Sequence, residues 1–385
     1  MGHVSSCING RAPCPTLDKK GMTMSRSPNA LPYWTLILPP LAWLVLGVSA
    51  FADGHPLVLA IVALSLAGAV FAAVHHAEVV AHRIGEPFGT LVLAIAVTII
   101  EVALIVSVML SAGAEKSGLA RDTVFAAVMI VCNGIVGTCL LVGGLRHGEQ
   151  DFRVSGANTA LTVLAALAIL TLVMPNYLSA APGPVLSTSQ LAFAGVASLA
   201  LYGVFVFIQT VRHRDYFLSG QAPQDESVHA EVPGTRTTLT SAIALVVCLV
   251  AVVLLAKRLS PAVERAVEAA GAPEAVVGIV IAALVLLPEG VAATRAAHAN
   301  RLQTSLNLAL GSALASIGLT IPTVAAVFVL NGMPLALGIG GMETVLLSLT
   351  LLVSTLTLAT GRTTILQGAV HLVLFAAYLF LSVTH

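Results

Sequence analysis

The sequence predicts an all-α protein that crosses a membrane many times, and both composition and hydropathy support this fold class. Charged residues make up 9% of the chain and hydrophobic residues 57%, with a mean hydropathy of +0.97. An ordinary soluble domain carries roughly 25% charged residues. The 18 basic and 18 acidic residues of this 385-residue chain are too few to cover a soluble surface. Because the net charge is zero and the sequence contains no basic patch, a nucleic-acid partner is also excluded.

The apolar stretches are long enough to cross a bilayer as helices, which takes about 20 residues each. They are apolar on every face rather than alternating, and this pattern excludes barrel strands. The polar residues 1–31 precede the first stretch and are predicted to form a disordered tail. We predict eleven transmembrane helices, at about 32–52, 57–80, 88–112, 122–145, 156–176, 189–211, 238–256, 274–294, 304–330, 334–359 and 363–383.

The distribution of lysine and arginine predicts how these spans face. With the N-terminus inside, 13 of the 18 basic residues fall in inner segments, including the polar loop at 212–237, and 5 fall in outer segments. Basic residues are enriched in cytoplasmic loops. We therefore expect a cytoplasmic N-terminus, a cytoplasmic 212–237 loop and an external C-terminus.

The spans also show an internal repeat. After the extra helix at 32–52, five spans at 57–211 and five at 238–383 follow the same layout. In each block the second span carries a glutamate, Glu101 or Glu289, and the third is rich in glycine, serine, threonine and asparagine. Because five is odd, the second block enters the membrane from the opposite face. Inverted repeats are typical of secondary transporters, which bind their ion near the midplane where the repeats meet.

Glu101 and Glu289 lie deep in their spans. A charged side chain at the centre of a membrane helix costs about 2.5–3.5 kcal/mol on insertion scales, so each glutamate must be protonated, paired or facing a polar cavity. Pro288 removes a backbone donor and frees a carbonyl oxygen near Glu289, and Gly290 lets another helix approach closely. The alternative is an ordinary proline kink and two neutral acids that are hydrogen-bonded to neighbouring helices.

The third span of each block offers further oxygen ligands, which hard cations such as Ca²⁺ prefer. Small polar residues also join membrane helices to one another, so both interpretations stay open. The candidates are Asn307, Ser312, Ser316 and Thr320 in the second block, and Asn133 and Thr138 in the first.

The paired glutamates predict a mechanism. Two carboxyl groups that share a low-dielectric pocket cannot easily both ionise. Two protons or one divalent cation would neutralise them, and these two loads exclude one another. A pocket that exposes them alternately to each side performs cation/proton exchange and needs no cofactor. A cation channel, which needs no such competition, is the less favoured alternative.

Two long stretches carry a family resemblance. "AEVVAHRIGEPFGTLVLAIAVTIIEVALIVSVML" and "PEGVAATRAAHANRLQTSLNLALGSALASIGLTIP" resemble the signature repeats of bacterial calcium/proton antiporters of the ChaA type, in the cation/calcium exchanger superfamily. The resemblance covers roughly residues 32–383. It implies two inverted five-helix bundles in a bacterial inner membrane that export Ca²⁺, or Na⁺ or K⁺, against proton entry. It also implies that Glu101 and Glu289 bind the metal cation and exchange protons.

The same resemblance places polar ligand positions at Ser312 and Asn133 on the helices that follow the glutamates. The chain departs from the broader superfamily at one point. Many exchangers have Gly-Asn four and three residues before each glutamate, whereas this chain has Val97-Thr98 and Val285-Leu286. The missing asparagines remove two oxygen ligands and leave the choice among Ca²⁺, Na⁺ and K⁺ open.

Other acidic residues are candidates for a proton path or a gate. His75, Glu78 and His82 share one helix face at one-turn spacing, and Glu78 matches an acidic residue ahead of the first family motif. An interfacial polar cluster is the alternative. Glu343 lies about ten residues into its predicted span. It either belongs to the ion or proton path or, as a neutral acid, forms a hydrogen bond between helices.

The sequence argues against a membrane enzyme. It contains neither the HExxH motif of zinc proteases nor the Walker A motif of ATP-driven transporters. We therefore expect a transporter without enzymatic activity, whose partners are the bilayer and the transported ions. The sequence leaves its oligomeric state open.

Overall fold

The computed structural model describes residues 31–49, 51, 55–85, 88–112, 117–178, 184–218, 233–332 and 335–384. Residues 1–30, for which the sequence predicts a disordered tail, lie outside the described residues. Residues 219–232, the middle of the polar loop, also lie outside them. The described chain is almost entirely helical. Its main elements are α1 (Tyr33–Ser49), α2 (Pro56–Ile84), α3 (Phe88–Ala112), α4 (Leu119–Met129), η2 (Ile130–Ile135), α5 (Val136–His147), β1 (Gln150–Asp151), α6 (Val154–Ala168), η3 (Ile169–Val173), η4 (Met174–Tyr177), α7 (Thr188–Phe207), η5 (Ile208–Arg212), η6 (Arg214–Tyr216), α8 (Thr235–Ala269), α9 (Ala275–His298), α10 (Leu302–Ala315), η7 (Ser316–Thr320), α11 (Ile321–Leu330), α12 (Gly341–Leu358), β2 (Arg362–Thr363) and α13 (Ile365–Thr384).

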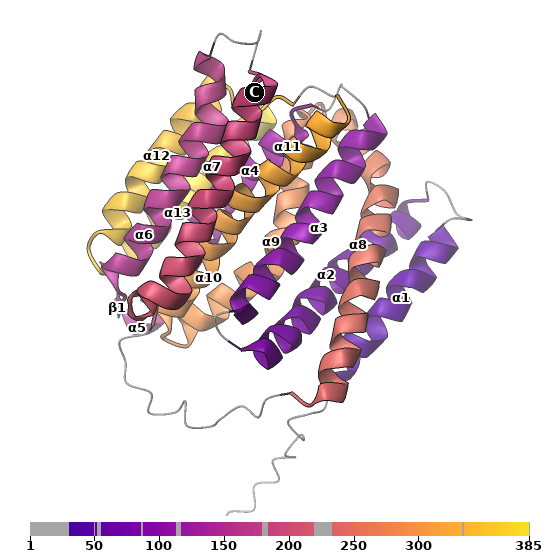
Figure 1. Cartoon of the computed structure of the whole chain (residues 1–385), viewed down its shortest axis with the longest axis horizontal. Helices are drawn as coiled ribbons and strands as arrows, with labels where there is room; N and C mark the ends of the chain where they lie inside the picture. Colours follow the sequence, from indigo (N-terminus) through magenta and orange to yellow (C-terminus); the bar gives the residue numbers. More distant parts are fainter. Residues whose placement is uncertain are drawn as a thin grey trace, which may run out of the picture.

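The helices divide into two packed groups. Helices α1, α2, α3 and α8 share one apolar core, and α2 packs along α8, its counterpart in the predicted second repeat. Most of the remaining helices share a second, larger core. In Figure 1, α1, α2 and α8 stand at one side of the bundle, and α6 and α12 stand at the other.

Two continuous helices occupy the centre of the bundle. Leu119–His147 and Leu302–Leu330 are 29 residues each, and 83% and 67% of their most apolar stretches are buried, against 17% for Ile365–Thr384. Each is interrupted near its middle by a π-helical segment, η2 in the first and η7 in the second. Such segments widen a helix locally and are frequent at functional sites.

Glycines in these two helices allow the outer helices to approach closely. A Cβ atom on Gly137 would lie 2.9 Å from Cβ of His371 in α13. A Cβ atom on Gly318 would lie 2.8 Å from Cβ of Tyr202 in α7. Since real Cβ atoms do not come this close to another side-chain carbon, the packing of α7 and α13 depends on glycine at both positions.

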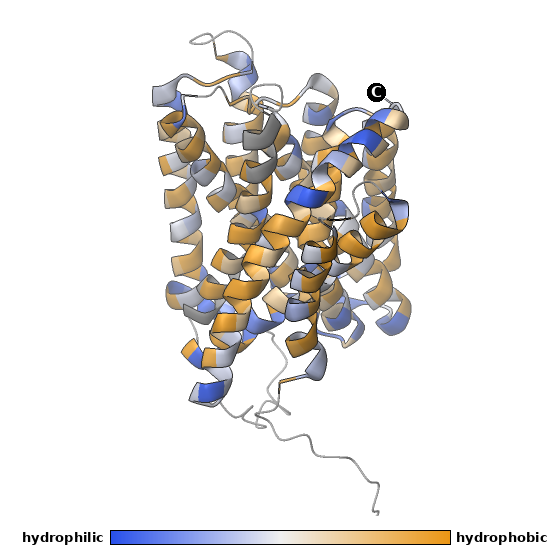
Figure 2. Ribbon diagram, turned by 90° about the vertical axis from the view of Figure 1, so that its right-hand side faces the viewer, coloured by the Kyte–Doolittle hydropathy of each residue, from blue (hydrophilic) through white to orange (hydrophobic). Residues whose placement is uncertain are grey.

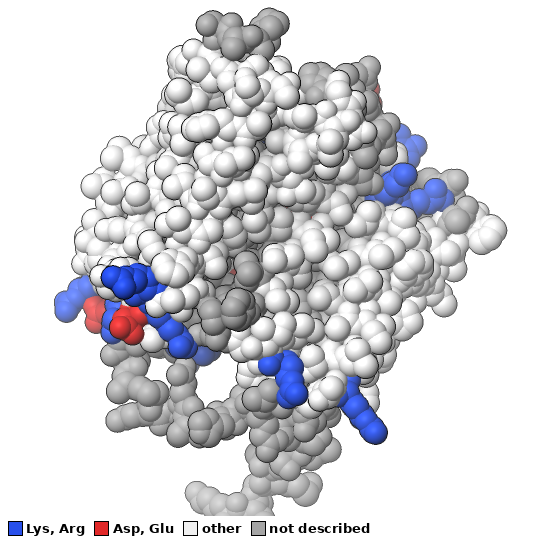
Figure 3. Space-filling view, viewed as in Figure 1, with Lys and Arg blue, Asp and Glu red and all other residues white. Residues whose placement is uncertain are grey.

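The surface is that of a membrane protein. Figure 2 shows apolar residues along the middle of the helices and hydrophilic residues mainly toward their ends. Figure 3 shows one face with lysine and arginine near its edges and a broad uncharged middle. Within the described residues, 9 helices are long and apolar enough to cross a membrane, and Tyr33–Ser49 and Ile95–Val106 are shorter apolar helices. The predicted all-α membrane fold is thereby confirmed, whereas the count of eleven spans and the inverted repeat stay predictions.

Two predicted helix boundaries are wrong. Helix α8, predicted to end at about residue 256, continues to Ala269. The span predicted at 334–359 begins as a helix only at Gly341, and residues 335–340 are not helical. The glycine-rich approach Gly338–Gly341 bonds to other segments instead, because the amide of Ile339 donates to the carbonyl of Leu172 at 2.8 Å. Glu343 consequently lies in the first turn of α12 rather than ten residues deep.

Candidate functional site

The first glutamate lies at the centre of the bundle, on α3. Glu101 is buried with 2% exposure, and the hydroxyl of Ser316 in η7 donates to its Oε2 at 2.9 Å. The buried hydroxyl of Thr320, one turn further on, lies beside the same carboxyl group. Oε1 of Glu101 also has no partner. A buried carboxyl oxygen without a donor is costly and suits a proton or a bound cation.

The second glutamate occupies a comparable position on α9. Glu289 is buried with 7% exposure, and its Oε2 has no hydrogen-bond partner. Pro288 precedes it inside the continuous helix, so the carbonyl of Leu284 loses the donor that another residue at 288 would provide. Gly290 follows it and allows Ile135 of η2 to pack against α9, as a Cβ atom there would lie 3.3 Å from Cδ1 of Ile135.

The structure places the two glutamates on adjacent helices. Helices α3 and α9 pack against each other, and the charges of Glu101 and Glu289 are close enough to interact. The described residues contain no group of three histidine, cysteine, aspartate or glutamate side chains that could hold a metal ion. A cation held by this pair would therefore take its other oxygens from hydroxyl groups, side-chain amides and backbone carbonyls.

The predicted polar ligands are only partly assembled around this pair. Ser316 is bonded to Glu101, as described. Ser312 lies one turn earlier and is half-buried. Asn307 lies in the N-terminal half of α10, where its Nδ2 donates to the carbonyl of Phe217 at 2.6 Å and its Oδ1 accepts from Gln303. In this conformation Asn307 is thus engaged away from the glutamates, and its predicted role as a ligand remains a prediction.

Asn133 is also engaged by other groups. It is fully buried in η2, where its Nδ2 donates to Oγ1 of Thr350 in α12 at 2.8 Å. Its Oδ1 lies 3.3 Å from Nδ1 of His371 in α13. Both polar ends of this amide therefore point toward α12 and α13, and no bond joins it to Glu101 or Glu289 among the described contacts.

Comparison with known proteins identifies the family. The model of the sodium/calcium exchanger protein family matches residues 54–211 and 240–384. The chain belongs to the sodium/calcium exchanger family. This result confirms the resemblance seen in the two glutamate stretches, and the match contains both glutamates.

Individual relatives agree with this assignment. The exchanger is 50% identical to y4hA of Sinorhizobium fredii, provisionally named an ionic transporter, over 91% of this chain and 96% of the relative. It is 39% identical to the sodium-potassium/proton antiporter ChaA of Escherichia coli, over 90% and 94%. Among solved structures, native YfkE matches with a TM-score of 0.72 at 18% identity, over 91% of this chain and 100% of that one, and this likeness shows the shared fold.

The exchanger departs from the superfamily pattern beside both glutamates, as the sequence indicates. Val97, Val285 and Leu286 are buried apolar side chains, and Thr98 is also buried. One turn before Glu289 the helix therefore supplies no side-chain oxygen. Thr98 offers the corresponding oxygen before Glu101.

The predicted gate residues lie in the C-terminal half of α2. Nδ1 of His75 is 3.9 Å from Oε2 of Glu78, and the Glu78 side chain is 51% exposed. The charge of Glu78 also interacts with that of Glu289. His82 is exposed near the end of the helix. His75 and Glu78 are thus brought together, whereas His82 lies at the surface.

Glu343 lies near a polar cavity away from the buried pair. The cavity, of about 380 Å³, lies between the first turns of α4 and α9, and its lining includes Arg121, Asp122 and Glu274. Nε of Arg121 donates to Asp122 at 2.6 Å, and Glu343 lies within electrostatic range of Asp122. Asp122 in this cavity is therefore hydrogen-bonded to Arg121, and neither Glu101 nor Glu289 lines the cavity.

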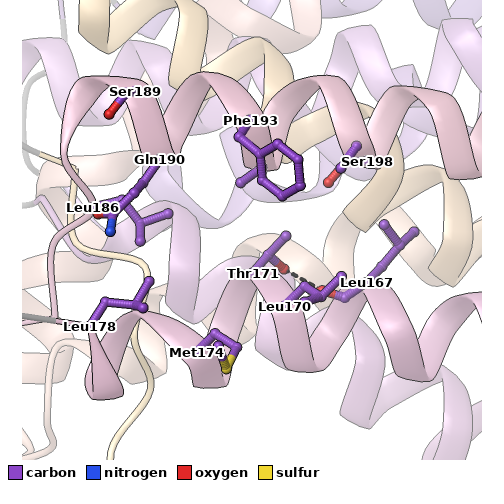
Figure 4. Close-up of a pocket in the computed structure, with 12 residues that line it drawn as sticks. Leu167, Leu170, Thr171, Met174, Leu178, Leu186, Ser189, Gln190, Phe193 and Ser198 are labelled. Carbon is purple, nitrogen blue, oxygen red and sulfur yellow. Dashed lines mark hydrogen bonds between the residues drawn. The ribbon is translucent and has the colours of Figure 1, made fainter.

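A second cavity is apolar. It occupies about 280 Å³ between α6 and α7 and is lined by Leu167, Met174, Phe193 and their neighbours, as Figure 4 shows. Its described lining contains hydroxyl and amide groups but no acidic or basic side chain.

Sequence reasoning missed two buried histidines. His76 is fully buried on α2 with its Nε2 3.0 Å from the carbonyl of Thr35, and His371 is fully buried on α13. His371 is an ionisable residue within the apolar stretch "GAVHLVLF" of α13, as Glu101 and Glu289 are within theirs. The depth argument applied to every ionisable residue would have found His371.

Proposed function

We propose that this protein is a secondary cation/proton antiporter that exports Ca²⁺ from the cytoplasm against proton entry. The observation that carries the proposal is the pair formed by Glu101 and Glu289. Both are buried, their charges interact, and each keeps one carboxyl oxygen without a hydrogen-bond partner. The names of relatives support it, since ChaA is named a sodium-potassium/proton antiporter and YfkE a Ca²⁺/H⁺ antiporter.

The charge on the pair explains why the two loads compete. An isolated charge in a low-dielectric interior is far more costly than a neutralised one. One Ca²⁺ or two protons leave Glu101 and Glu289 without net charge, whereas the empty ionised pair is disfavoured. The protein therefore changes its facing direction most readily when one load or the other is bound, and this couples the two flows.

A monovalent cation is the second candidate. Ca²⁺ takes six to eight oxygen ligands. The nearby side-chain oxygens come from the two carboxyl groups and from Ser316, Thr320 and Thr98. Val285 and Leu286 flank Glu289 with apolar surface. This short supply of oxygens, and the 39% identity to ChaA, favour Na⁺ or K⁺ as the alternative cargo.

The pair formed by His75 and Glu78 is proposed as the inner end of the proton path. Glu78 is half-exposed near the end of α2 and interacts with the charge of Glu289. A carboxyl group in that position can pass a proton between the inner surface and the buried pair. Glu343, in the first turn of α12, is the corresponding candidate at the outer end.

We place the protein in the bacterial inner membrane with its N-terminus in the cytoplasm. The inner ends of the helices gather arginines that bond to other segments, for example Arg83 to the carbonyl of Pro233 and Arg153 to that of Asp215. This accumulation suits the cytoplasmic side. Single cysteines in a background without native cysteines test it. A cysteine at Glu149 should react with a membrane-impermeant thiol reagent only in everted vesicles, and one at Glu274 only in intact cells.

The transport proposal is tested in everted membrane vesicles. Respiration acidifies the vesicle lumen, a fluorescent dye reports the pH gradient, and Ca²⁺, Na⁺ and K⁺ are added in turn. An antiporter that accepts the added cation collapses the gradient, and the concentrations needed for half-maximal effect rank the ions. If none of the three cations releases the gradient above vesicles that lack the protein, the proposal is refuted.

The same vesicles separate antiport from channel activity. When the membrane potential is short-circuited with valinomycin and K⁺, obligatory exchange still moves protons in response to Ca²⁺ or Na⁺. Radioactive cation flux through a channel would continue after the pH gradient is abolished. Flux of that kind would favour the channel alternative.

A further inference from the structure

The two buried glutamates lie on helix turns of different chemistry. Side chains on an α-helix lean toward its N-terminus, so each carboxyl group lies over the turn that precedes it. The turn before Glu101 contains the hydroxyl of Thr98, which is buried. The turn before Glu289 is entirely apolar, with the sequence "LVLL" at 284–287, and Leu286 lies three residues before its glutamate as Thr98 does. The two predicted repeats therefore differ beside their glutamates.

The segments that face the two glutamates differ in the same direction. Segment η7 gives Glu101 the hydroxyl of Ser316, which donates to Oε2 at 2.9 Å, and Thr320 lies beside the same carboxyl group. Segment η2 packs on α9 through the apolar side chain of Ile135, whose Cδ1 would lie 3.3 Å from a Cβ atom on the glycine that follows Glu289. Oε2 of Glu289 has no hydrogen-bond partner. Hydroxyl oxygens therefore gather on the Glu101 side, and apolar side chains gather on the Glu289 side.

This uneven supply of oxygens favours one position for a cation. A hard cation exchanges its water ligands for protein oxygens, and apolar side chains offer none. Next to Glu101 the cation can meet two carboxyl oxygens and three hydroxyls, those of Thr98, Ser316 and Thr320. These oxygens are fewer than the six to eight that Ca²⁺ takes, and Leu286 stands where one more could be supplied.

We propose that the transported cation binds off centre, against Glu101, and that Leu286 is a specificity-determining residue that weakens Ca²⁺ more than Na⁺ or K⁺. A missing oxygen costs Ca²⁺ more than a monovalent cation, because a double charge is more costly to remove from water. Glu289 then balances charge from its apolar surroundings without completing the oxygen shell. This inference rests on the proposed cation/proton exchange and concerns the choice of ion within it.

The test compares Leu286→Thr with Leu286→Val, because threonine and valine have the same shape and differ in one hydroxyl. The half-saturating concentrations of Ca²⁺ and Na⁺ are measured at one pH in everted vesicles. The added hydroxyl should lower the Ca²⁺ value about tenfold relative to Leu286→Val, since a bond to a charged group contributes that much in a buried site. The Na⁺ value should fall much less. If the wild type responds to monovalent cations alone, Leu286→Thr should add a Ca²⁺ response that Leu286→Val lacks.

Two controls separate ion selectivity from a general effect on the fold. Leu287→Thr adds the same hydroxyl at the next position, where the side chain is 45% exposed, and should leave the ratio of the Ca²⁺ and Na⁺ values unchanged. Thr98→Val should raise the values for every cation, because it removes a hydroxyl beside Glu101. Thr98→Ser, which retains the hydroxyl, should restore them. A loss of folding would lower the amount of inserted protein and would not change the ratio.

The outcomes are separable from those of the transport proposal. If none of the three cations releases the pH gradient in wild-type vesicles, the exchange proposal is refuted and this inference with it. If the wild type exchanges, the same Ca²⁺ to Na⁺ ratio in Leu286→Thr and Leu286→Val overturns this inference alone. Should both Leu286 variants fail to insert, the Thr98 variants decide the question, since equal values for Thr98→Val and Thr98→Ser would overturn the off-centre site.

Discussion

The hydrogen bond between Ser316 and Glu101 makes a prediction that can be sized from the structure. The hydroxyl lies 2.9 Å from a carboxyl oxygen in a site with 2% exposure, so solvent cannot replace it. A hydrogen bond to a charged group is worth about 1.5–3 kcal/mol net, which corresponds to about a 10- to 150-fold change in an equilibrium. The Thr320 hydroxyl beside the same carboxyl group can take over part of the role, so the lower end applies. We expect Ser316→Ala to raise the half-saturating cation concentration about tenfold.

The direction follows from the competition between the loads. The Ser316 hydroxyl donates to the ionised carboxylate, which is the form that binds the cation. Its loss gives the proton an advantage, and therefore the defect should shrink as the assay pH is raised. Adding Thr320→Val to Ser316→Ala should enlarge the defect, because no hydroxyl then remains near Glu101.

The measurement is the pH-gradient assay in everted vesicles at several pH values, with protein amount determined by immunoblot. Ser198→Ala is the matched control, since Ser198 has 1% exposure and its hydroxyl has no partner. A half-saturating concentration for Ser316→Ala within twofold of the control at every pH would refute the argument that this bond supports cation binding.

Two further predictions concern the carboxyl pair and the central helices. Glu101→Gln and Glu289→Gln should each abolish exchange while the protein still inserts, because a glutamine cannot release a proton or neutralise a cation; normal exchange in either variant would remove that residue from the site. Gly318→Ala should lower the free energy of unfolding by about 1–3 kcal/mol, because its Cβ atom would meet Tyr202 at 2.8 Å. This loss would be measured as a lower unfolding temperature in detergent. Gly311→Ala, on the preceding turns where nothing lies within 4 Å, should leave that temperature unchanged or raise it, and equal destabilisation by both would contradict the packing argument.

Much of this fold is readable from the sequence because the bilayer imposes a simple rule. Apolar stretches of about 20 residues must be helical there. The boundary of α12 was missed because the apolar residues 335–340 extend the hydropathy pattern of the helix, although this glycine-containing segment is not helical. Glu343 was placed too deep for the same reason.

The candidate site shows where such reasoning stops. Glu101 and Glu289 could be identified because each lies deep within a predicted span. Ser316 could be identified from the spacing of polar residues along the span that follows Glu289. The orientation of Asn133 was not predictable, because its partners Thr350 and His371 are 217 and 238 residues away in the chain. Which of two polar neighbours an amide chooses depends on tertiary packing, and the sequence pattern of one helix carries no information about it.

The contact between Glu101 and Ser316 joins residues that are 215 positions apart and come from different halves of the chain. During synthesis, α3 enters the bilayer long before η7 exists, so its carboxyl group waits without the hydroxyl that later bonds to it. Nascent chains that end before residue 316 should therefore be poor at remaining inserted, and a separately produced first half should need the second half present to be stable. Any quality-control protease that recognises exposed polar groups within the membrane would have its best opportunity in that interval.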